Sequence, residues 1–188
     1  MDAIQDVAAA RELLSLRASE QRFLRGEVTS RPSSNYTDSS RFAMERQRVF
    51  RRLPHAIAHS SELAGPGGFL SGSYAGVPLL LTRDGNGRVH AFLNACRHRG
   101  MRLVGDEQGC ARRFTCPYHA WTYDANGELL AAPHFEQGFG ELDRAELALH
   151  RFTCEERFGL VWITLDKENP VALDELLAPG ADDLAALA

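Results

Sequence analysis

Two short segments decide how this sequence can be interpreted: Cys96–Gly100, CRHRG, and Cys116–Trp121, CPYHAW. They are 15 residues apart, and each contributes one cysteine and one histidine, in the patterns Cys-x-His and Cys-x-x-His. Thiolate and imidazole groups are ligands of zinc and of mixed-ligand iron–sulfur clusters. The four candidate metal ligands are Cys96, His98, Cys116 and His119, with 17 residues between the second and the third.

The distribution of the four candidate ligands over the two segments distinguishes a zinc finger from a dinuclear iron site. Zinc fingers draw two cysteines from one knuckle and two histidines from a helix. Here each segment mixes a cysteine with a histidine, which suits a dinuclear iron site that both segments contact. One iron would take the two cysteines and the other the two histidines. A structural zinc site stays open as the alternative.

Composition and charge restrict the class of protein. The chain has 188 residues, of which 44% are hydrophobic and 24% are charged, so we expect an ordinary globular core. The formal net charge of −4 gives no electrostatic reason to expect nucleic acid or an anionic membrane as a partner. We find no signal peptide and no apolar run near the roughly 20 residues of a spanning helix. Four cysteines in such a chain favour a reducing compartment, which predicts a cytoplasmic protein.

The middle of the chain, residues 54–166, consists of short extended runs bounded by Gly, Pro, Asn and Asp. Asp-x-Asn-Gly turns at 84–87 and 124–127 accept the positive φ of tight hairpins. Successive hairpins predict a mainly β, antiparallel domain. CRHRG follows one predicted strand and CPYHAW another, so we expect the candidate ligands on two loops at strand ends. The predicted strands are HAIAHS, FLSGSY, VPLLLTR, VHAFLNA, RRFTC, AWTY, GELLAA and LVWITL.

The parts on either side of this β domain are predicted to be helical. Residues 1–53 form an extension with one helix over 3–25 and a second helix that Asp38 or Ser39 caps. Their arginines are interpreted as solvated faces. Residues 167–188 form a polar tail with a short helical piece, which we interpret as the start of a linker to a further domain.

The two segments resemble the Rieske [2Fe–2S] domain of aromatic ring-hydroxylating (Rieske non-haem iron) oxygenase α subunits. The resemblance begins with the C-x-H-x17-C-x2-H pattern and extends over about residues 36–170. It includes YTDSSRFAMERQRVFRR, HSSEL, LLLTRDGNGRVHAFLNACRHRG and ERFGLVWITL. It implies a Rieske-type antiparallel β-sandwich with two cluster-binding loops. It also implies a [2Fe–2S] cluster on the four candidate ligands.

Residues next to the ligands are given supporting roles. Arg97 and Arg99 are interpreted as charges that ease cluster reduction or dock an acidic ferredoxin, with surface ion pairs as the alternative. Tyr118 and Trp121 are expected to pack around the cluster. Respiratory Rieske proteins have extra loop cysteines and a serine donor, where this chain has Ala120. We therefore expect a potential toward the low end of the Rieske range of about −150 to +300 mV.

The remaining cysteines and histidines have no partner motif. Cys110 and Cys154 are predicted to be free thiols. Five histidines are predicted to be surface residues or hydrogen-bonded core residues rather than ligands: His55, His59, His90, His134 and His150.

By resemblance, the chain corresponds to the N-terminal Rieske portion of an oxygenase. The family's oxygen-activating iron is held by two histidines and a carboxylate. No histidine pair with the N-x2-H-x4-5-H pattern follows His119, so we expect a part that is not catalytically complete alone. A ferredoxin or flavin reductase is the implied electron donor and an oxygenase catalytic domain the implied acceptor. Homotrimeric assembly is plausible by the same resemblance. The alternative is a stand-alone Rieske ferredoxin or a redox-sensing module, which the helical extension disfavours.

Overall fold

The computed structural model describes residues 3–19, 29–105, 107–168 and 171–187. The strands are β1 His55–His59, β2 Gly68–Tyr74, β3 Val77–Arg83, β4 Val89–Leu93, β5 Gln108–Cys110, β6 Arg113–Thr115, β7 Thr122–Asp124, β8 Leu129–Ala131, β9 Arg151–Arg157 and β10 Leu160–Thr164. The helices are α1 Ala3–Ala18, α2 Ser34–Thr37, α3 Ser39–Glu45, α4 Phe135–Phe139, α5 Leu173–Leu177 and α6 Ala181–Leu187. Shorter turns are the π-helical η1 Arg46–Phe50 and the 3-10 segments η2 Ser60–Leu63, η3 Arg144–Leu147 and η4 Ala178–Gly180.

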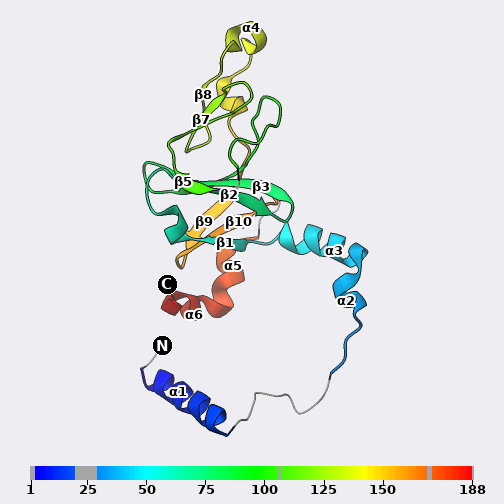
Figure 1. The fold of residues 1–188 in the computed structure, drawn as a ribbon, viewed down its shortest axis with the longest axis vertical. Coiled ribbons are helices and arrows are strands. Elements are labelled where there is room, and N and C mark those ends of the chain that lie inside the picture. Colours follow the sequence, from blue (N-terminus) through cyan, green and yellow to red (C-terminus); the bar gives the residue numbers. More distant parts are fainter. Residues whose placement is uncertain (1–2, 20–28, 106, 169–170, 188) are drawn as a thin grey trace.

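In the part of the chain that the structure describes, ten antiparallel strands form two sheets. The larger sheet has seven strands in the order β1-β10-β9-β4-β3-β2-β5, and the smaller has three in the order β6-β7-β8. The smaller sheet and α4 lie on one side of the larger sheet, and α5 and α6 lie on the other (Figure 1). This arrangement confirms the predicted fold class, a mainly β antiparallel fold preceded by helices.

Strand β3 is buried on both faces of the larger sheet. Its residues alternate between two hydrophobic clusters, as the period of two along a strand requires. Leu80 is fully buried among residues of the smaller sheet, including Tyr123. Leu79 and Leu81 point to the opposite face, where they pack with Ile163 of β10. A strand buried in this way is hydrophobic at consecutive positions, which is the pattern of VPLLLTR.

The two predicted Asp-x-Asn-Gly turns adopt the same conformation. In each turn the aspartate Oδ1 accepts hydrogen bonds from the backbone N–H groups two and four residues later, at 2.8 and 2.9 Å. Gly87 and Gly127 close the turns with φ of +83° and +80°. The turn 84–87 joins β3 to β4, and the turn 124–127 joins β7 to β8.

The turn 124–127 also attaches the smaller sheet to the larger one. Thr82 Oγ1 of β3 donates to the Ala125 carbonyl at 2.6 Å. Arg151 of β9 donates to the Asn126 carbonyl at 2.7 Å, and a backbone N–H after η3 bonds the Gly127 carbonyl at 2.8 Å. Three consecutive carbonyls of one turn therefore bond to residues outside the smaller sheet.

We expect Thr82→Val to lower the free energy of unfolding by about 1–2 kcal/mol. Thr82 is fully buried, and valine has nearly the same shape but leaves the Ala125 carbonyl without its donor. Urea denaturation monitored by tryptophan fluorescence measures the change. Thr153→Val on an exposed position of β9 is the control, for which we expect a change within about 0.5 kcal/mol. Equal losses in the two variants would contradict the importance of this bond.

Most predicted elements agree with the structure. Asp38 caps α3 by accepting hydrogen bonds from the N–H groups of Ser40 and Arg41, as predicted. The helix predicted over 3–25 extends over Ala3–Ala18, and residues 20–25 lie outside the described part of the chain. Two strands were missed, β5 and β9. The division of the chain into three parts at 53 and 166 stays a prediction.

Within the described ranges, no helix combines the length and the hydrophobicity that crossing a bilayer would require.

Candidate metal centre

The two segments singled out in the sequence form loops of the same backbone shape. We call Cys96–Met101 loop 1 and Cys116–Trp121 loop 2. In each loop the cysteine N–H donates to the carbonyl five residues later, and the N–H four residues later donates back to the cysteine carbonyl. These bonds are Cys96 N to Met101 O at 2.8 Å, Gly100 N to Cys96 O at 2.8 Å, Cys116 N to Trp121 O at 2.8 Å and Ala120 N to Cys116 O at 3.0 Å.

The fourth position after each cysteine has a left-handed backbone, which turns the chain back toward its strand. In loop 1 this position is Gly100, with φ +71°, and glycine adopts this conformation without steric cost. In loop 2 it is Ala120, with φ +57°, where a Cβ atom makes the same turn strained by roughly 1–2 kcal/mol. Loop 2 therefore keeps its shape because its surroundings hold it there.

The loops bring all four candidate ligands together. The Cys96 and Cys116 side chains are buried, at 3% and 2% exposed, and their thiols interact with each other. The His98 and His119 rings are partly exposed, and their centroids lie 4.6 Å apart. In the described part of the chain, no three His, Cys, Asp or Glu side chains are grouped as ligands of one ion. In a dinuclear cluster of this type each iron has two protein ligands, so a group of three around one ion is not required.

The histidine nitrogens provide the test of whether these residues suit a metal. His98 Nδ1 and His119 Nδ1 are both buried, and neither has a hydrogen-bond partner among the described residues. A buried polar atom without a partner costs about 1–3 kcal/mol, and a metal bound to these two nitrogens would remove that cost. Burial lowers the pKa of His98, and the charges of His119 and Arg99 lower it further. A neutral imidazole has a free lone pair for a metal. The residues fit a metal site.

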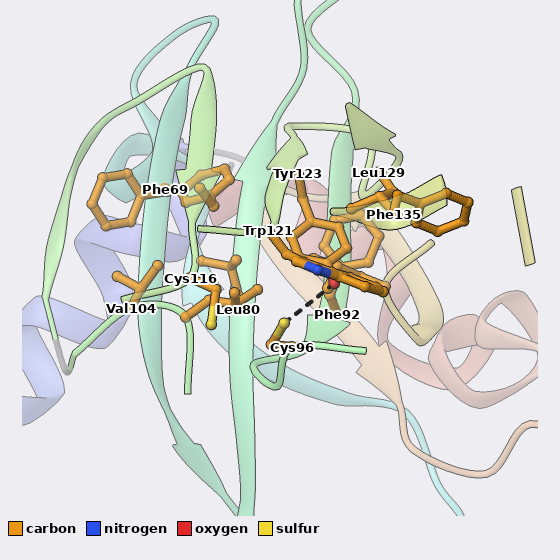
Figure 2. Packing of buried hydrophobic residues seen from close by; sticks show 13 residues of the cluster. Phe69, Leu80, Phe92, Cys96, Val104, Cys116, Trp121, Tyr123, Leu129 and Phe135 are labelled. Carbon is orange, nitrogen blue, oxygen red and sulfur yellow. Dashed lines mark hydrogen bonds between the residues drawn. The ribbon is translucent and has the colours of Figure 1, made fainter. Parts of the chain in front are cut away.

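The environment of the thiols includes a hydroxyl group that the sequence analysis missed. Burial raises the pKa of the Cys96 thiol, and Tyr123 Oη lies 3.4 Å from Cys96 Sγ. Figure 2 marks this contact with a dashed line. The Arg97 N–H donates to the same Tyr123 oxygen at 3.0 Å, so the hydroxyl proton is available to the sulfur. Burial also raises the pKa of Tyr123, which keeps that proton on the oxygen.

Aromatic side chains cover the histidine rings. Trp121 is buried and stacks on His98, with ring centroids 4.9 Å apart and planes at 11°. Phe139 of α4 meets His98 edge to face at 5.6 Å. Tyr118 is 58% exposed and lies against His119, with centroids 3.8 Å apart. Together these rings limit the access of water to the imidazoles.

Arg97 and Arg99, for which supporting roles were predicted, differ in their surroundings. The Arg97 guanidinium bonds His150 Nε2 and the Glu146 carbonyl of η3. Arg99 is exposed. The supporting roles predicted for both residues remain predictions. All four cysteines lie within the described residues and are free thiols, as predicted for Cys110 and Cys154.

An open groove of about 680 Å³ runs over the two histidines. Loop 2, part of loop 1 and α4 line it, so a partner molecule placed there would face both imidazole rings. Helix α4 contributes Phe139 to the groove, while Phe135 packs behind it against Trp121. Helix α4 contains none of the residues that were predicted to belong to the site.

Comparison with known proteins identifies the family. Residues 54–153 match the model of the Rieske [2Fe-2S] domain. The chain belongs to this family. The Rieske family match assigns a Rieske-type [2Fe–2S] cluster to the chain and sets aside the zinc alternative.

Curated proteins that are similar to this chain include oxygenase subunits. The benzene 1,2-dioxygenase subunit alpha of Pseudomonas putida is 34% identical over 142 residues, which cover 76% of this chain and 31% of that protein. The glycine betaine monooxygenase oxygenase subunit of Pseudomonas aeruginosa is 37% identical over 149 residues, covering 79% and 34%. This chain therefore spans about a third of the length of the curated relatives that it matches.

Solved structures with a fold similar to this chain are also oxygenases. The apo form of a quaternary ammonium Rieske monooxygenase superposes with a TM-score of 0.76 at 31% identity, covering 84% of this chain and 45% of that one. Naphthalene 1,2-dioxygenase from Rhodococcus sp. gives a TM-score of 0.72 at 31% identity, covering 78% and 33%. The fold of this Rieske domain is thus shared with oxygenases of both mono- and dioxygenase type.

Proposed function

We propose that Cys96, His98, Cys116 and His119 hold the [2Fe–2S] cluster, with the cysteines on one iron and the histidines on the other. The single observation that carries this assignment is the pair of buried Nδ1 atoms that lack partners among the described residues. They lie on rings 4.6 Å apart, and both loops also supply a buried thiol. When bound, such a cluster supplies a one-electron redox couple at about −150 to +300 mV.

The surrounding residues have three tasks in this function. Trp121 and Phe139 cover part of the His98 ring, which lowers the local dielectric constant on that side. Tyr123 offers its hydroxyl proton to Cys96 Sγ, and the Arg97 N–H holds the Tyr123 oxygen in place. A hydrogen bond to a sulfur stabilises added negative charge there. A low potential was predicted partly because the loops lack donors to the sulfurs, and Tyr123 of β7 supplies one such donor from outside the two loops.

We propose that the chain passes single electrons to the mononuclear iron of a ring-hydroxylating oxygenase. Support comes from the relatives, which are dioxygenase and monooxygenase subunits. The same relatives disfavour a stand-alone ferredoxin or sensor. A ferredoxin or flavin reductase would supply the electrons, an oxygenase catalytic domain would accept them, and the assembly would be a homotrimer in the cytoplasm. The groove over His98 and His119 is the surface at which a partner would approach them.

Anaerobic purification of the chain tests both proposals. We expect two iron and two sulfide per chain, and an EPR signal of the mixed Cys/His type that appears only after reduction with dithionite. Stopped-flow mixing of the reduced chain with oxygen and an oxygenase catalytic fragment holding Fe(II) and substrate should then show faster oxidation of the cluster than oxygen alone produces. Stoichiometric zinc without an EPR signal would refute the ligand assignment. A normal cluster that the catalytic fragment cannot oxidise would refute only the proposed acceptor.

Tyr123→Phe is expected to lower the midpoint potential of the cluster by about 20–60 mV. This range corresponds to one hydrogen bond of about 0.5–1.5 kcal/mol in a one-electron couple. The shift is downward because the lost donor stabilises the reduced, more negative state. Redox titration followed by visible absorption measures it. Tyr36→Phe, on a tyrosine that is 81% exposed on α2, is the control and should leave the potential unchanged. An unchanged or higher potential in Tyr123→Phe would contradict the assignment.

A further inference from the structure

The two loops of the metal centre are closed at their bases in different ways. Loop 2 leaves β6 and returns into β7, and the pair Thr115 and Thr122 of these strands lies directly below it. The two threonine Oγ1 atoms are 3.0 Å apart, which adds a side-chain bond to the ladder. Loop 1 leaves β4, but the described residues up to 105 that follow it belong to no strand. The base of loop 1 is therefore held by something other than a β ladder.

The side chain of Asn94 lies at the base of loop 1. It lies two residues before Cys96 and is 1% exposed. Its Oδ1 accepts from the N–H groups of Leu103 and Val104 at 3.1 and 3.2 Å. Its Nδ2 donates to the Val104 carbonyl and to Ser71 Oγ, both at 2.8 Å. An amide side chain has two donor hydrogens and two acceptor lone pairs, so every hydrogen-bonding position of Asn94 is used.

The Asn94 amide replaces the missing strand pairing. It bonds both the N–H and the C=O of Val104, as a neighbouring strand residue would. The Asn94 backbone N–H bonds the Pro78 carbonyl of β3 at 2.9 Å, which fixes this side of the loop to the larger sheet. On the other side, the Leu103 and Val104 side chains are buried in the core cluster that includes Cys96 and Cys116. One side chain thus joins the start and the end of loop 1.

We propose that Asn94 is a positioning residue for the cluster. By closing loop 1 at its base, it fixes where Cys96 and His98 stand relative to loop 2. The consequence for the cluster rests on the proposed function, whereas the closure of the loop does not. A fully satisfied buried amide is rigid, because every alternative arrangement would leave buried groups without partners.

The test compares Asn94→Leu with a control elsewhere in the core. Leucine has the same number and branching of side-chain heavy atoms as asparagine, but its methyl groups form no hydrogen bonds and leave Leu103 and Val104 without their partner. Ile163→Ala is the control, because Ile163 is equally buried but lies in the hydrophobic cluster on the opposite face of the larger sheet. Ser71→Ala is a milder variant, which removes one acceptor of the Asn94 amide and the longer bond of 3.5 Å from Ser71 Oγ to the Val104 carbonyl.

Hydrogen exchange of the cluster-loaded chain, followed by mass spectrometry, is the first measurement. We expect Asn94→Leu to speed exchange in residues 96–104 by roughly 10- to 100-fold, the factor for losing the partner of a buried group. Residues 116–122 should exchange at the wild-type rate. Ser71→Ala should show a smaller change in the same segment. Unchanged exchange in 96–104, or equal acceleration of both loops, would overturn the proposal. If Asn94→Leu does not fold, Ser71→Ala decides: unchanged exchange in 96–104, or equal acceleration of both loops, would again overturn the proposal.

The midpoint potential and the EPR spectrum of the reduced chain are the second measurement. We expect both to change in Asn94→Leu and to stay at wild-type values in Ile163→Ala, although both variants lose stability. Wild-type spectra in Asn94→Leu would overturn the positioning role. If the wild-type chain binds no cluster, the proposed function fails, and the same hydrogen-exchange comparison on the cluster-free chains decides whether Asn94 closes the loop.

Discussion

The Cys116→Ser variant is expected to retain almost no iron or sulfide after purification. The Cys116 thiol is 2% exposed and lies beside the Cys96 thiol, so its sulfur is placed to bind a metal shared by the two loops. Serine offers a harder oxygen with a much higher pKa in place of a thiolate. Changing residues that only support metal ligands costs about 10–100-fold in metal affinity, and loss of a ligand should cost at least as much.

Iron and sulfide analysis together with visible absorption measures this effect, and the chain offers a matched control. Cys110 is an exposed free thiol on β5, so Cys110→Ser changes the same atom outside the metal centre. We expect full cluster content in Cys110→Ser. Retention of the cluster in Cys116→Ser would show that the proposed ligand set is wrong. Loss in both variants would point to a general effect of cysteine replacement.

Local patterns in the sequence were sufficient to predict the candidate ligands. Each loop carries its cysteine, its histidine and its turn within six residues, so the chemistry is visible without knowledge of the fold. The Asp-x-Asn-Gly turns were predictable for the same reason, because the aspartate bonds N–H groups only two and four residues away. Features of this kind depend on short-range geometry.

Strand β9 was missed because its sequence is mostly charged. It lies between β4 and β10, yet only Phe152 and Cys154 point toward the core, and the other five residues are exposed. Two inward residues give too short an alternation to stand out from the charged residues around them. Strand β5 has only three residues, all exposed, and gives no hydrophobic signal.

Contacts between distant parts of the chain account for the residues of the site that were missed. Tyr123 reaches a sulfur 27 positions earlier, and Asn94 bonds groups nine, ten and 23 positions away. Nothing in the spacing of these residues reveals such pairs before the sheets are assembled. The alternation of Trp121, at the end of loop 2, and Tyr123 was an available signal, since alternate residues of an extended segment face the same side.

Gly127→Ala is expected to lower the free energy of unfolding by about 2–5 kcal/mol, the largest loss of stability that we expect from a single added methyl group. A Cβ atom at Gly127 would lie 2.5 Å from Cε1 and 2.8 Å from Cζ of the buried Phe92 ring. Relieving that overlap costs about 1–3 kcal/mol. The φ of +80° adds about 1–2 kcal/mol of backbone strain for any residue with a Cβ.

Gly87→Ala separates these two contributions, because its turn has the same hydrogen bonds and a φ of +83° but has no atom within 4 Å of the added Cβ. We expect it to cost only the backbone part, so the difference between the two variants in urea denaturation measures the contact with Phe92. The turn at Gly127 holds the sheet that carries loop 2, and pushing it away from Phe92 should also reduce iron content in Gly127→Ala. Equal losses of stability in the two variants would mean that the Phe92 ring yields freely. The close approach of this glycine would then have no part in holding loop 2 against the larger sheet.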